Sequence, residues 1–352
     1  MKIWRMIGMM SGTSLDGVDI AYCTFTQKHE KWEFDIGPAE TITYDKHWLE
    51  TLKQLSYSRS SEISRKHFAY GEYLGKLARN FINKHKLQAE SIASHGHTIF
   101  HQPDAGYTFQ LGEGTALSIA SGLPVVTDFR SRDVLLGGQG APLVPIGDRL
   151  LFSEYAVCIN LGGFSNCSYE HNHQRIAFDI CPANVALNHF AGAFGLAYDR
   201  DGRMAAQGRV NTELLRALNG LDFYRQAAPK SLGREWFEEK FLKVFEKYEI
   251  AAADKLRTIT EHCAIQICNA IGQVGDGKVL LTGGGAKNRL LVKRIRELSN
   301  KEIIVPEKKI IDYKEALVFA FLGLLRRENK INCLASVTGA RQDSSCGSIF
   351  LP

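Results

Sequence analysis

The chain has 352 residues, of which 45% are hydrophobic and 23% charged, and it carries a formal net charge of +5 with 32 glycines and 9 prolines. Single hydrophobic cores stop growing near roughly 250 to 300 residues, so this length predicts two lobes. The composition excludes a disordered chain, and the basic residues are interleaved with acidic ones instead of forming the basic block of a nucleic-acid-binding protein.

The sequence also argues against membrane and zinc-binding classes. It contains no apolar stretch of about 20 residues, so no membrane span is predicted. The apolar run at the N-terminus is short and interrupted by Arg5, which is not typical of a secretory signal. The eight cysteines include no CxxC pair. They are interpreted as buried free thiols in a reducing cytoplasm.

The first predicted elements are two strands that flank the turn IGMMSGTSLDGVD (7–19). Glycines in such a turn permit positive φ and bring N–H groups close to an anion, while its hydroxyl groups add donors and its acids suit a hydrated Mg²⁺. It is not a Walker A loop, and an ordinary hairpin turn would use the same residue types. The candidate nucleotide ligands here are Gly12, Thr13, Ser14, Leu15, Asp16, Gly17, Val18 and Asp19, with Asp16 and Asp19 also as candidate Mg²⁺ ligands.

The rest of the first lobe begins with a third strand over 31–44 and amphipathic helices over 46–87. The segment SIASHGHTIFHQP (91–103) then holds His95, His97 and His101. Three histidines suggest a metal site, but no acid or cysteine accompanies them at ligand spacing. We therefore favour a loop that contacts substrate.

Residues 107–145 are predicted to form a strand, a helix starting near Glu113, the strand VVTDF and a glycine-rich loop. The strand VVTDF delivers Arg130, Arg132 and Asp133 to its carboxyl end, where open α/β sheets bind ligands. A guanidinium group there can pair with a carboxylate or phosphate, although a surface salt-bridge cluster would have the same pattern. The loop GGQGAPLVP (137–145) is expected to cross between the lobes.

The second lobe opens with YAVCINLGGFSNCSY (155–169), which repeats the layout of the first hairpin. Its turn offers Gly162 and Gly163 to a phosphate, and the repetition suggests two similar lobes. The strand IAFDI then ends with Asp179 beside a helix that starts at Asn184. This acid is placed either to act as a general base or to cap the helix.

After a long helix over 251–274, the segment KVLLTGGGAKNRLLVKRIREL (278–298) predicts a strand, a glycine run and a helix. Gly283, Gly284 and Gly285 would let backbone amides and the helix dipole meet a nucleotide, with Asn288 capping the helix or bonding the ligand. A plain strand-to-helix turn is the alternative. A strand at 302–307, a buried helix containing Glu315 and a polar tail ending in a short strand complete the chain.

Three glycine turns in this order resemble the phosphate and adenosine loops of the acetate and sugar kinase, heat-shock ATPase and actin superfamily. Within it the chain is similar over nearly its whole length to the anhydro-N-acetylmuramic acid kinase family. The segments that carry the resemblance include MSGTSLDG, VVTDFRSRDVLLGGQGAPLVP, NLGGFSN, FDICPAN, PKSLGREWF and LTGGGAKN.

The resemblance implies an α/β fold in which two ribonuclease H-like lobes close over ATP in a central cleft. We expect a first lobe of 1–130 completed by 335–352, and a second lobe of 131–334. The resemblance implies that 12–19 binds ATP phosphates and that Asp179 is the catalytic base. It also implies a homodimer. The predicted substrate ligands are Ser11, His95, Arg130 and Glu315.

The sequence departs from the family pattern beside the predicted base, where Ile180, Cys181 and Ala183 stand in place of the usual Thr, Gly and Gly. His97 replaces a usual Gln, and Asp148 a usual His. The implied activity is ATP- and Mg²⁺-dependent hydrolysis and phosphorylation of 1,6-anhydro-N-acetylmuramic acid. A kinase acting on an ordinary sugar hydroxyl and a non-catalytic ATP-binding sensor are the alternatives.

Overall fold

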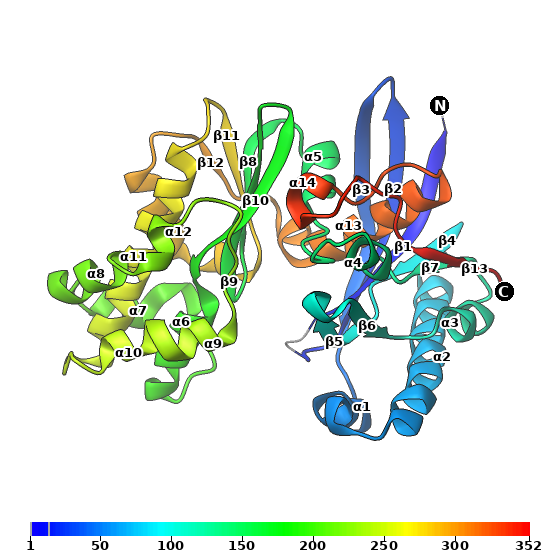
Figure 1. Cartoon of the computed structure of the whole chain (residues 1–352), viewed down its shortest axis with the longest axis horizontal. Helices are drawn as coiled ribbons and strands as arrows, with labels where there is room; N and C mark the ends of the chain where they lie inside the picture. Colours follow the sequence, from blue (N-terminus) through cyan, green and yellow to red (C-terminus); the bar gives the residue numbers. More distant parts are fainter. Residues whose placement is uncertain (1, 13–14) are drawn as a thin grey trace. The chain divides into compact units, whose positions relative to one another are not determined.

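The computed structural model describes residues 2–12 and 15–352 and divides the chain into two compact units. Unit 1 comprises the residues up to Leu151 together with Tyr313–Pro352, and unit 2 comprises Phe152–Asp312. Each unit is built around its own sheet (Figure 1). Among the described residues, no helix has the length and apolar character that crossing a membrane requires.

The main sheet of unit 1 has the strand order β13-β7-β4-β1-β2-β3. Its strands are β1 (Ile3–Ser11), β2 (Val18–Lys28), β3 (Lys31–Ile42), β4 (Ser91–Ser94), β7 (Val125–Thr127) and β13 (Ser348–Phe350). β1, β2 and β3 form an antiparallel meander, whereas β4 and β7 run parallel to β1. A separate two-stranded sheet pairs β5 (His97–Gln102) with β6 (Tyr107–Leu111).

Helices cover both faces of this sheet. They are α1 (Lys46–Gln54), α2 (Ser60–His85), α3 (Gly114–Ser121), α4 (Ser131–Leu135), α5 (Pro145–Leu151), α13 (Lys308–Arg327) and α14 (Ala335–Thr338). Ile7 and Met9 of β1 belong to one core with Tyr70 and Leu74 of α2. Neighbouring positions of the same strand contact α13, because successive side chains of a strand point to opposite faces.

Unit 2 repeats the arrangement with the strand order β10-β9-β8-β11-β12. Its strands are β8 (Tyr155–Leu161), β9 (Phe164–His171), β10 (Gln174–Pro182), β11 (Lys278–Thr282) and β12 (Ile303–Ile304). β8, β9 and β10 form the antiparallel meander, and β11 and β12 run parallel to β8. Both units therefore share the order 3-2-1-4-5 of a ribonuclease H-like sheet, which confirms the predicted fold class and the internal repetition.

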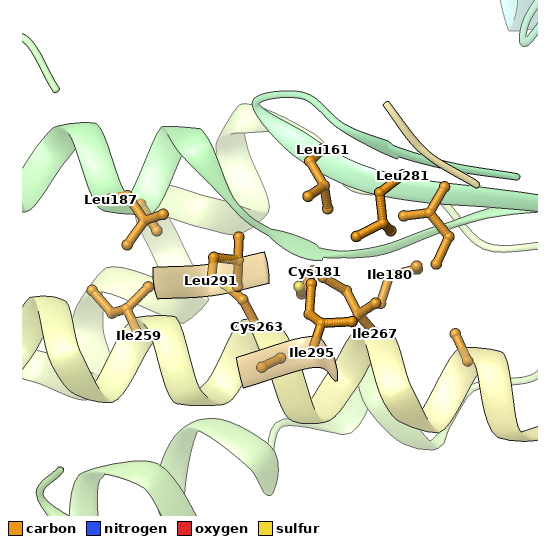
Figure 2. Close-up of a cluster of buried hydrophobic side chains, with 14 of the residues drawn as sticks. Leu161, Ile180, Cys181, Leu187, Ile259, Cys263, Ile267, Leu281, Leu291 and Ile295 are labelled. Atoms are coloured by element: carbon orange, nitrogen blue, oxygen red, sulfur yellow. The ribbon is translucent and has the colours of Figure 1, made fainter. Parts of the chain in front are cut away.

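The long helix α11 (Ala252–Gly272) packs against this second sheet, and Figure 2 shows the core between them. The labelled side chains there come from α11 (Ile259, Cys263, Ile267), from the strands (Leu161, Ile180, Cys181, Leu281), from α6 (Leu187) and from α12 (Leu291, Ile295). Full burial of each leucine or isoleucine contributes about 1.5 to 3 kcal/mol. The other helices are α6 (Asn184–Ala191), α7 (Arg203–Gln207), α8 (Thr212–Asn219), α9 (Arg234–Trp236), α10 (Leu242–Phe245) and α12 (Arg289–Leu298).

All eight cysteines lie among the described residues and are free thiols, and seven of them are buried. Cys268 is the half-buried exception. This burial matches the interpretation of the cysteines as buried thiols.

The unit boundaries differ from the expected lobes, because residues 131–151 and 313–334 belong to unit 1. The buried Asp133 explains much of this difference. Its carboxylate accepts hydrogen bonds from the Gly140 amide at 2.8 Å, the Thr338 hydroxyl at 2.8 Å and the Cys333 thiol at 3.1 Å. The loop 137–145 is therefore held inside unit 1 and does not cross between the units.

The contact between β1 and α13 predicts a strict requirement at Gly8. A Cβ there would lie 1.9 Å from the carbonyl oxygen of Ala316. Gly8→Ala should lower the free energy of unfolding by about 3 kcal/mol, because backbone atoms must move apart to admit the methyl group. Urea unfolding of the purified variant measures this loss.

Gly272→Ala is the matched control. A Cβ at this helix end meets no described atom within 4 Å, so alanine should be neutral or stabilising there. Equal stability of the two variants would contradict the close packing of β1 on α13.

Candidate active site

The turn between β1 and β2 begins after Ser11 and ends before Val18, which face each other across the hairpin. Thr13 and Ser14 lie outside the described residues. Gly17 has φ of 150°, and a Cβ there would lie 2.4 Å from the carbonyl oxygen of Ile42. Glycine is therefore required at this position by packing and by backbone conformation.

The described part of this turn is held by its own backbone. The Leu15 amide donates to the Gly12 carbonyl at 3.3 Å, and Leu15 adopts a left-handed φ of 60°. A non-glycine residue in this conformation is uncommon and marks a tightly constrained loop. Asp16 follows at the surface with an exposed side chain.

Ser11 belongs to a buried hydrogen-bonded chain. Its hydroxyl lies 2.9 Å from Nδ1 of His97 and 2.5 Å from the hydroxyl of Tyr44, which in turn lies 2.6 Å from the hydroxyl of Tyr70. Burial lowers the pKa of His97 to about 4, so its imidazole is neutral at neutral pH. This chain fixes the orientation of Ser11 at the end of β1.

Arg130 follows β7 at its carboxyl end and is bound to His95. Its Nε and Nη2 atoms lie 3.0 and 2.9 Å from Nε2 of His95, and its Nη1 atom donates to the Gly140 carbonyl at 2.7 Å. Nδ1 of His95 lies 2.9 Å from the Gly96 carbonyl oxygen, which assigns the proton to Nδ1 and makes Nε2 the acceptor.

Electrostatics keep this pair in one protonation state. Burial and the neighbouring Arg130 charge hold the pKa of His95 well below its ordinary value. Burial lowers the pKa of Arg130 to about 10, opposed by Glu315 and Asp133, so the guanidinium remains charged at neutral pH. A neutral imidazole therefore orients a cation without cancelling its charge.

Glu315 and Asp19 add negative charge to the same part of unit 1. The surrounding protein raises the pKa of Glu315 by desolvation, and Asp19 raises it further, whereas Arg130 and Lys314 lower it. Asp19 accepts a 2.5 Å hydrogen bond from the Thr41 hydroxyl. The predicted substrate ligands Ser11, His95, Arg130 and Glu315 thus all belong to unit 1.

The three histidines are not arranged as metal ligands. Among residues 2–12 and 15–352, no group of three or more His, Cys, Asp or Glu side chains is placed to hold a metal ion. His95 and His97 use ring nitrogens to bind Arg130 and Ser11, and Nδ1 of His101 lies 3.1 Å from the Thr108 hydroxyl. In these contacts the three histidines serve as hydrogen-bonding groups of a polar segment.

Asp179 is the candidate base in unit 2. It lies within β10, which continues past it to Pro182 through an irregularity between Asp179 and Cys181, so the strand is longer than the sequence predicts. Its Oδ2 atom accepts the Leu232 amide at 2.8 Å. Burial raises the pKa of Asp179, and this hydrogen bond opposes the shift. No described residue donates a hydrogen bond to Oδ1.

The turn between β8 and β9 has a structural role at the start of α6. The Gly163 carbonyl accepts from the amides of Ala183 and Val185 at 2.9 and 3.1 Å, and the Gly162 carbonyl accepts from the Asn184 amide at 3.2 Å. These bonds satisfy amides that a helix N-terminus otherwise leaves without partners. Helix capping at this point is done by the glycine turn and not by Asp179.

The glycine run after β11 lies against the β8–β9 turn. Gly283 has φ of 80°, and a Cβ there would lie 2.4 Å from Oδ1 of Asn160. At Gly285 a Cβ would lie 2.8 Å from the Leu161 side chain and 2.9 Å from Oδ1 of Asn184, whose amide nitrogen donates to the Leu161 carbonyl at 2.9 Å. The structure therefore brings the two glycine turns of unit 2 together around Asn184.

Asn288 caps α12, since its side chain accepts the Leu291 amide at 3.1 Å. Gly202 approaches it, because a Cβ there would lie 2.7 Å from Oδ1 of Asn288. Of the two roles considered from the sequence, capping is the one that these contacts support. The same bond fixes the first turn of α12 beside Gly284 and Gly285.

Sequence reasoning missed several residues of these sites. Tyr44 and Tyr70 were assigned only to a strand and a helix, and Leu232 received no role. Their partners Ser11 and Asp179 lie 33 and 53 residues away in sequence, so no local pattern connects them. For Asn184 the sequence gave one usable signal, because a polar residue at the start of a predicted helix indicates a hydrogen-bonding role there.

The buried His97 predicts a pH-dependent loss of stability. Its pKa is about 4 in the folded state and near 6.5 when unfolded, so the stabilisation is complete above pH 6.5 and is lost as the pH falls toward 4. When the pH falls from 7.5 to 5, the free energy of unfolding of the wild-type protein should decrease by about 2 kcal/mol more than that of His97→Gln. Urea unfolding of both proteins at the two pH values measures the difference, and identical losses would contradict a neutral buried His97.

Two solved structures share a distant resemblance with the chain. Component A of the (R)-2-hydroxyglutaryl-CoA dehydratase of Acidaminococcus fermentans is 12% identical, with a TM-score of 0.48 over 91% of this chain and 97% of its own. A ROK family glucokinase from Streptomyces griseus is 11% identical, with a TM-score of 0.42 over 91% and 99%. The fold assignment rests on the strand order of the two sheets.

Sequence relatives cover the whole chain. An anhydro-N-acetylmuramic acid kinase from Haemophilus influenzae is 35% identical over 99% of this chain and 98% of its own, and one from Mannheimia succiniciproducens is 34% identical over 98% of each. A family model described as anhydro-N-acetylmuramic acid kinase matches residues 4–352. The chain therefore belongs to the anhydro-N-acetylmuramic acid kinase family.

Proposed function

We propose that this protein uses ATP to convert 1,6-anhydro-N-acetylmuramic acid and water into N-acetylmuramic acid 6-phosphate and ADP. Family membership over nearly the whole chain supports the reaction class. The single observation that carries the mechanism is the Asp179 carboxylate, which has one oxygen bound to an amide and the other without a described hydrogen-bond donor.

Asp179 is suited to act as a general base. Burial raises its pKa above the ordinary value for an aspartate, which strengthens it as a base. The Leu232 amide holds Oδ2 and thereby fixes the orientation of the carboxylate. We propose that the other oxygen, Oδ1, accepts the proton from water. A base held in one orientation meets the geometric requirement for proton transfer.

In the proposed reaction, Asp179 takes a proton from water as the water oxygen bonds to the anomeric carbon. The bond from that carbon to the bridging oxygen breaks, and the oxygen stays on carbon 6. There it attacks the γ-phosphorus of ATP, and ADP leaves. Attack from the opposite face resembles inverting glycoside hydrolysis, with phosphoryl transfer replacing protonation of the leaving oxygen.

Arg130 is proposed to hold the lactyl carboxylate of the sugar. Two of its five N–H groups point to His95 and one to Gly140, which leaves two for a ligand. Two parallel N–H donors match the two oxygens of a carboxylate. Ser11 and Glu315 are the further proposed sugar contacts, since both lie in the same unit with buried hydrogen-bond or charge partners.

The glycine turns are the proposed ATP ligands. In unit 2, Gly283 and Gly285 have no room for a side chain. The run leads through the 3₁₀ turn Gly284–Lys287 to the N-terminus of α12, where amides and the helix dipole favour an anion. The proposed nucleotide contacts there are Gly162, Gly163, Gly283, Gly284, Gly285 and Asn288. In unit 1 they are residues 12–19, of which Gly17 is shown to need glycine.

Mg²⁺ is proposed to accompany the nucleotide. Asp16 and Asp19 both act electrostatically on Tyr44, so the two carboxylates lie on one side of unit 1. Their oxygens suit Mg²⁺, and with too few protein ligands for a closed cage they fit an ion that keeps water and phosphate oxygens. When bound, Mg²⁺ would neutralise charge on the transferring phosphoryl group.

Asp179→Asn should lower the rate of sugar-dependent ATP consumption by a factor of about 10² to 10⁴, because the amide cannot accept the proton. ATP binding should persist. A coupled ADP assay with and without 1,6-anhydro-N-acetylmuramic acid measures the rate, and calorimetry measures ATP binding. In ¹⁸O water the wild-type product should carry label at the anomeric carbon.

An unlabelled phosphorylated product would indicate a kinase that acts on an ordinary hydroxyl. ATP binding without any response to the sugar would indicate a sensor and contradict the proposed reaction.

Arg130→Lys should raise the KM for the sugar about 10- to 100-fold, because a lysine cannot reproduce two parallel hydrogen bonds to a carboxylate. The KM for ATP should stay unchanged. Arg132→Lys, at an exposed neighbouring position, is the matched control and should leave both constants unaltered. A sugar KM that does not respond to Arg130→Lys would exclude the carboxylate contact.

A further inference from the structure

The loop that precedes α9 contacts Asp179 although it is otherwise exposed. Residues 225–229 are all exposed, whereas Lys230 is half-buried and Leu232 is buried. The Lys230 carbonyl accepts the Asp179 amide at 3.0 Å, and the Leu232 amide donates to Oδ2 of Asp179 at 2.8 Å. This loop therefore holds both the backbone and the carboxylate of Asp179.

Lys230 anchors the loop through its side chain. Its ammonium group donates to the Phe223 carbonyl at 3.1 Å in η5 (Asp222–Arg225). It also lies 4.6 Å from the centre of the Phe223 ring and 5.7 Å from that of Phe178, the residue beside Asp179. A cation this close to the centres of two aromatic rings is attracted to both, and a half-buried site strengthens the attraction.

We propose that Lys230 is a positioning residue, which holds the Leu232 amide against the Asp179 carboxylate and so sets the orientation and basicity of the base. The inference rests on the proposed role of Asp179. Lys230 acts through the backbone, since its own carbonyl and the amide two residues later are the groups that bond to Asp179.

The consequence for Asp179 follows from the charge of its ionised form. A hydrogen bond to a carboxylate favours the ionised state and opposes the rise in pKa that burial causes. If the loop loses its anchor, this bond lengthens or breaks for part of the time. The pKa of Asp179 then rises further, and the carboxylate rotates away from the orientation that the reaction needs.

The neighbouring titratable groups do not produce the same effect. Cys167 on β9 feels the charges of Asp179, Arg175 and Lys230, but burial raises its pKa to about 12, so it stays a neutral thiol. Burial lowers the pKa of Lys230 from its ordinary alkaline value, so this group loses its proton from the alkaline side. Neither Cys167 nor Lys230 titrates on the acidic side, so a shift of the acidic limb in a Lys230 variant reports Asp179.

The test compares three full-length variants. Lys230→Met keeps the aliphatic stem and removes the ammonium group, and Lys230→Arg restores a cation. Arg234→Met is the matched control, because Arg234 begins α9 directly after this loop and its exposed side chain forms an ion pair with Glu238. The readouts are kcat against pH, the KM for ATP, and the pKa of Asp179 from carboxyl ¹³C NMR.

Lys230→Met should shift the acidic limb of the pH profile of kcat, and the pKa of Asp179 measured by NMR, upward by about one pH unit. It should lower kcat about tenfold and leave the KM for ATP unchanged. Lys230→Arg should recover most of the shift, and Arg234→Met should match the wild type. An Asp179 pKa that does not move in Lys230→Met would overturn the proposal. Because the NMR titration needs no turnover, it decides the positioning role even if Asp179→Asn retains activity and the proposed function fails.

Discussion

The close approach of α13 to β1 is the constraint on which the geometry of unit 1 depends. Gly8 allows the backbone of Ala316 to lie where any side chain would collide. Ser11 stands three residues beyond Gly8 on the same strand, and Glu315 directly precedes Ala316 on the helix. The packing of one glycine thus fixes the relation between the Ser11 hydroxyl and the Glu315 carboxylate. That carboxylate acts electrostatically with Asp19 and Arg130. A tightly packed core transmits such a constraint because it has little room to relax.

Each unit holds one charged group in place with uncharged partners. In unit 1 a neutral imidazole and a carbonyl orient Arg130, and in unit 2 a single amide orients Asp179. An ion pair would orient these groups equally well, but it would reduce the charge that a ligand or a proton needs to meet. Desolvation limits how far such a group can be buried without an ion pair, since removing an unpaired charge from water costs free energy that hydrogen bonds must offset. The two groups are therefore only partly buried, which keeps their cost small.

Local patterns in the sequence predicted the long helices and most of the strands, because hydrophobic periodicity and glycine positions are local signals. The segment 91–103 was interpreted as a loop, whereas it forms β4 and β5. Glu113 and Asn288 were correctly placed at helix starts. The unit boundaries were not predicted, since they depend on Asp133 bonding to Cys333 and Thr338 about 200 residues away. The hydrogen-bond partners of Ser11 and Asp179 were not predicted for the same reason. Tyr44 and Leu232 carry no signal of their own, and only the folded chain brings them to these sites.

The repeated strand order has an evolutionary consequence. Two sheets of the same topology, each with its own core, are what duplication of one ancestral gene segment would leave. The first hairpin turn of each sheet differs between the two units. In unit 2 the carbonyls of Gly162 and Gly163 bind amides at the start of α6. In unit 1 the turn follows Ser11, whose hydroxyl is hydrogen-bonded to histidine and tyrosine side chains. Mutational drift in the second copy is thus restrained by the start of α6, and in the first by the packing of Gly17. A laboratory library aimed at a new sugar should therefore diversify the surroundings of Ser11 and leave the turn before α6 intact.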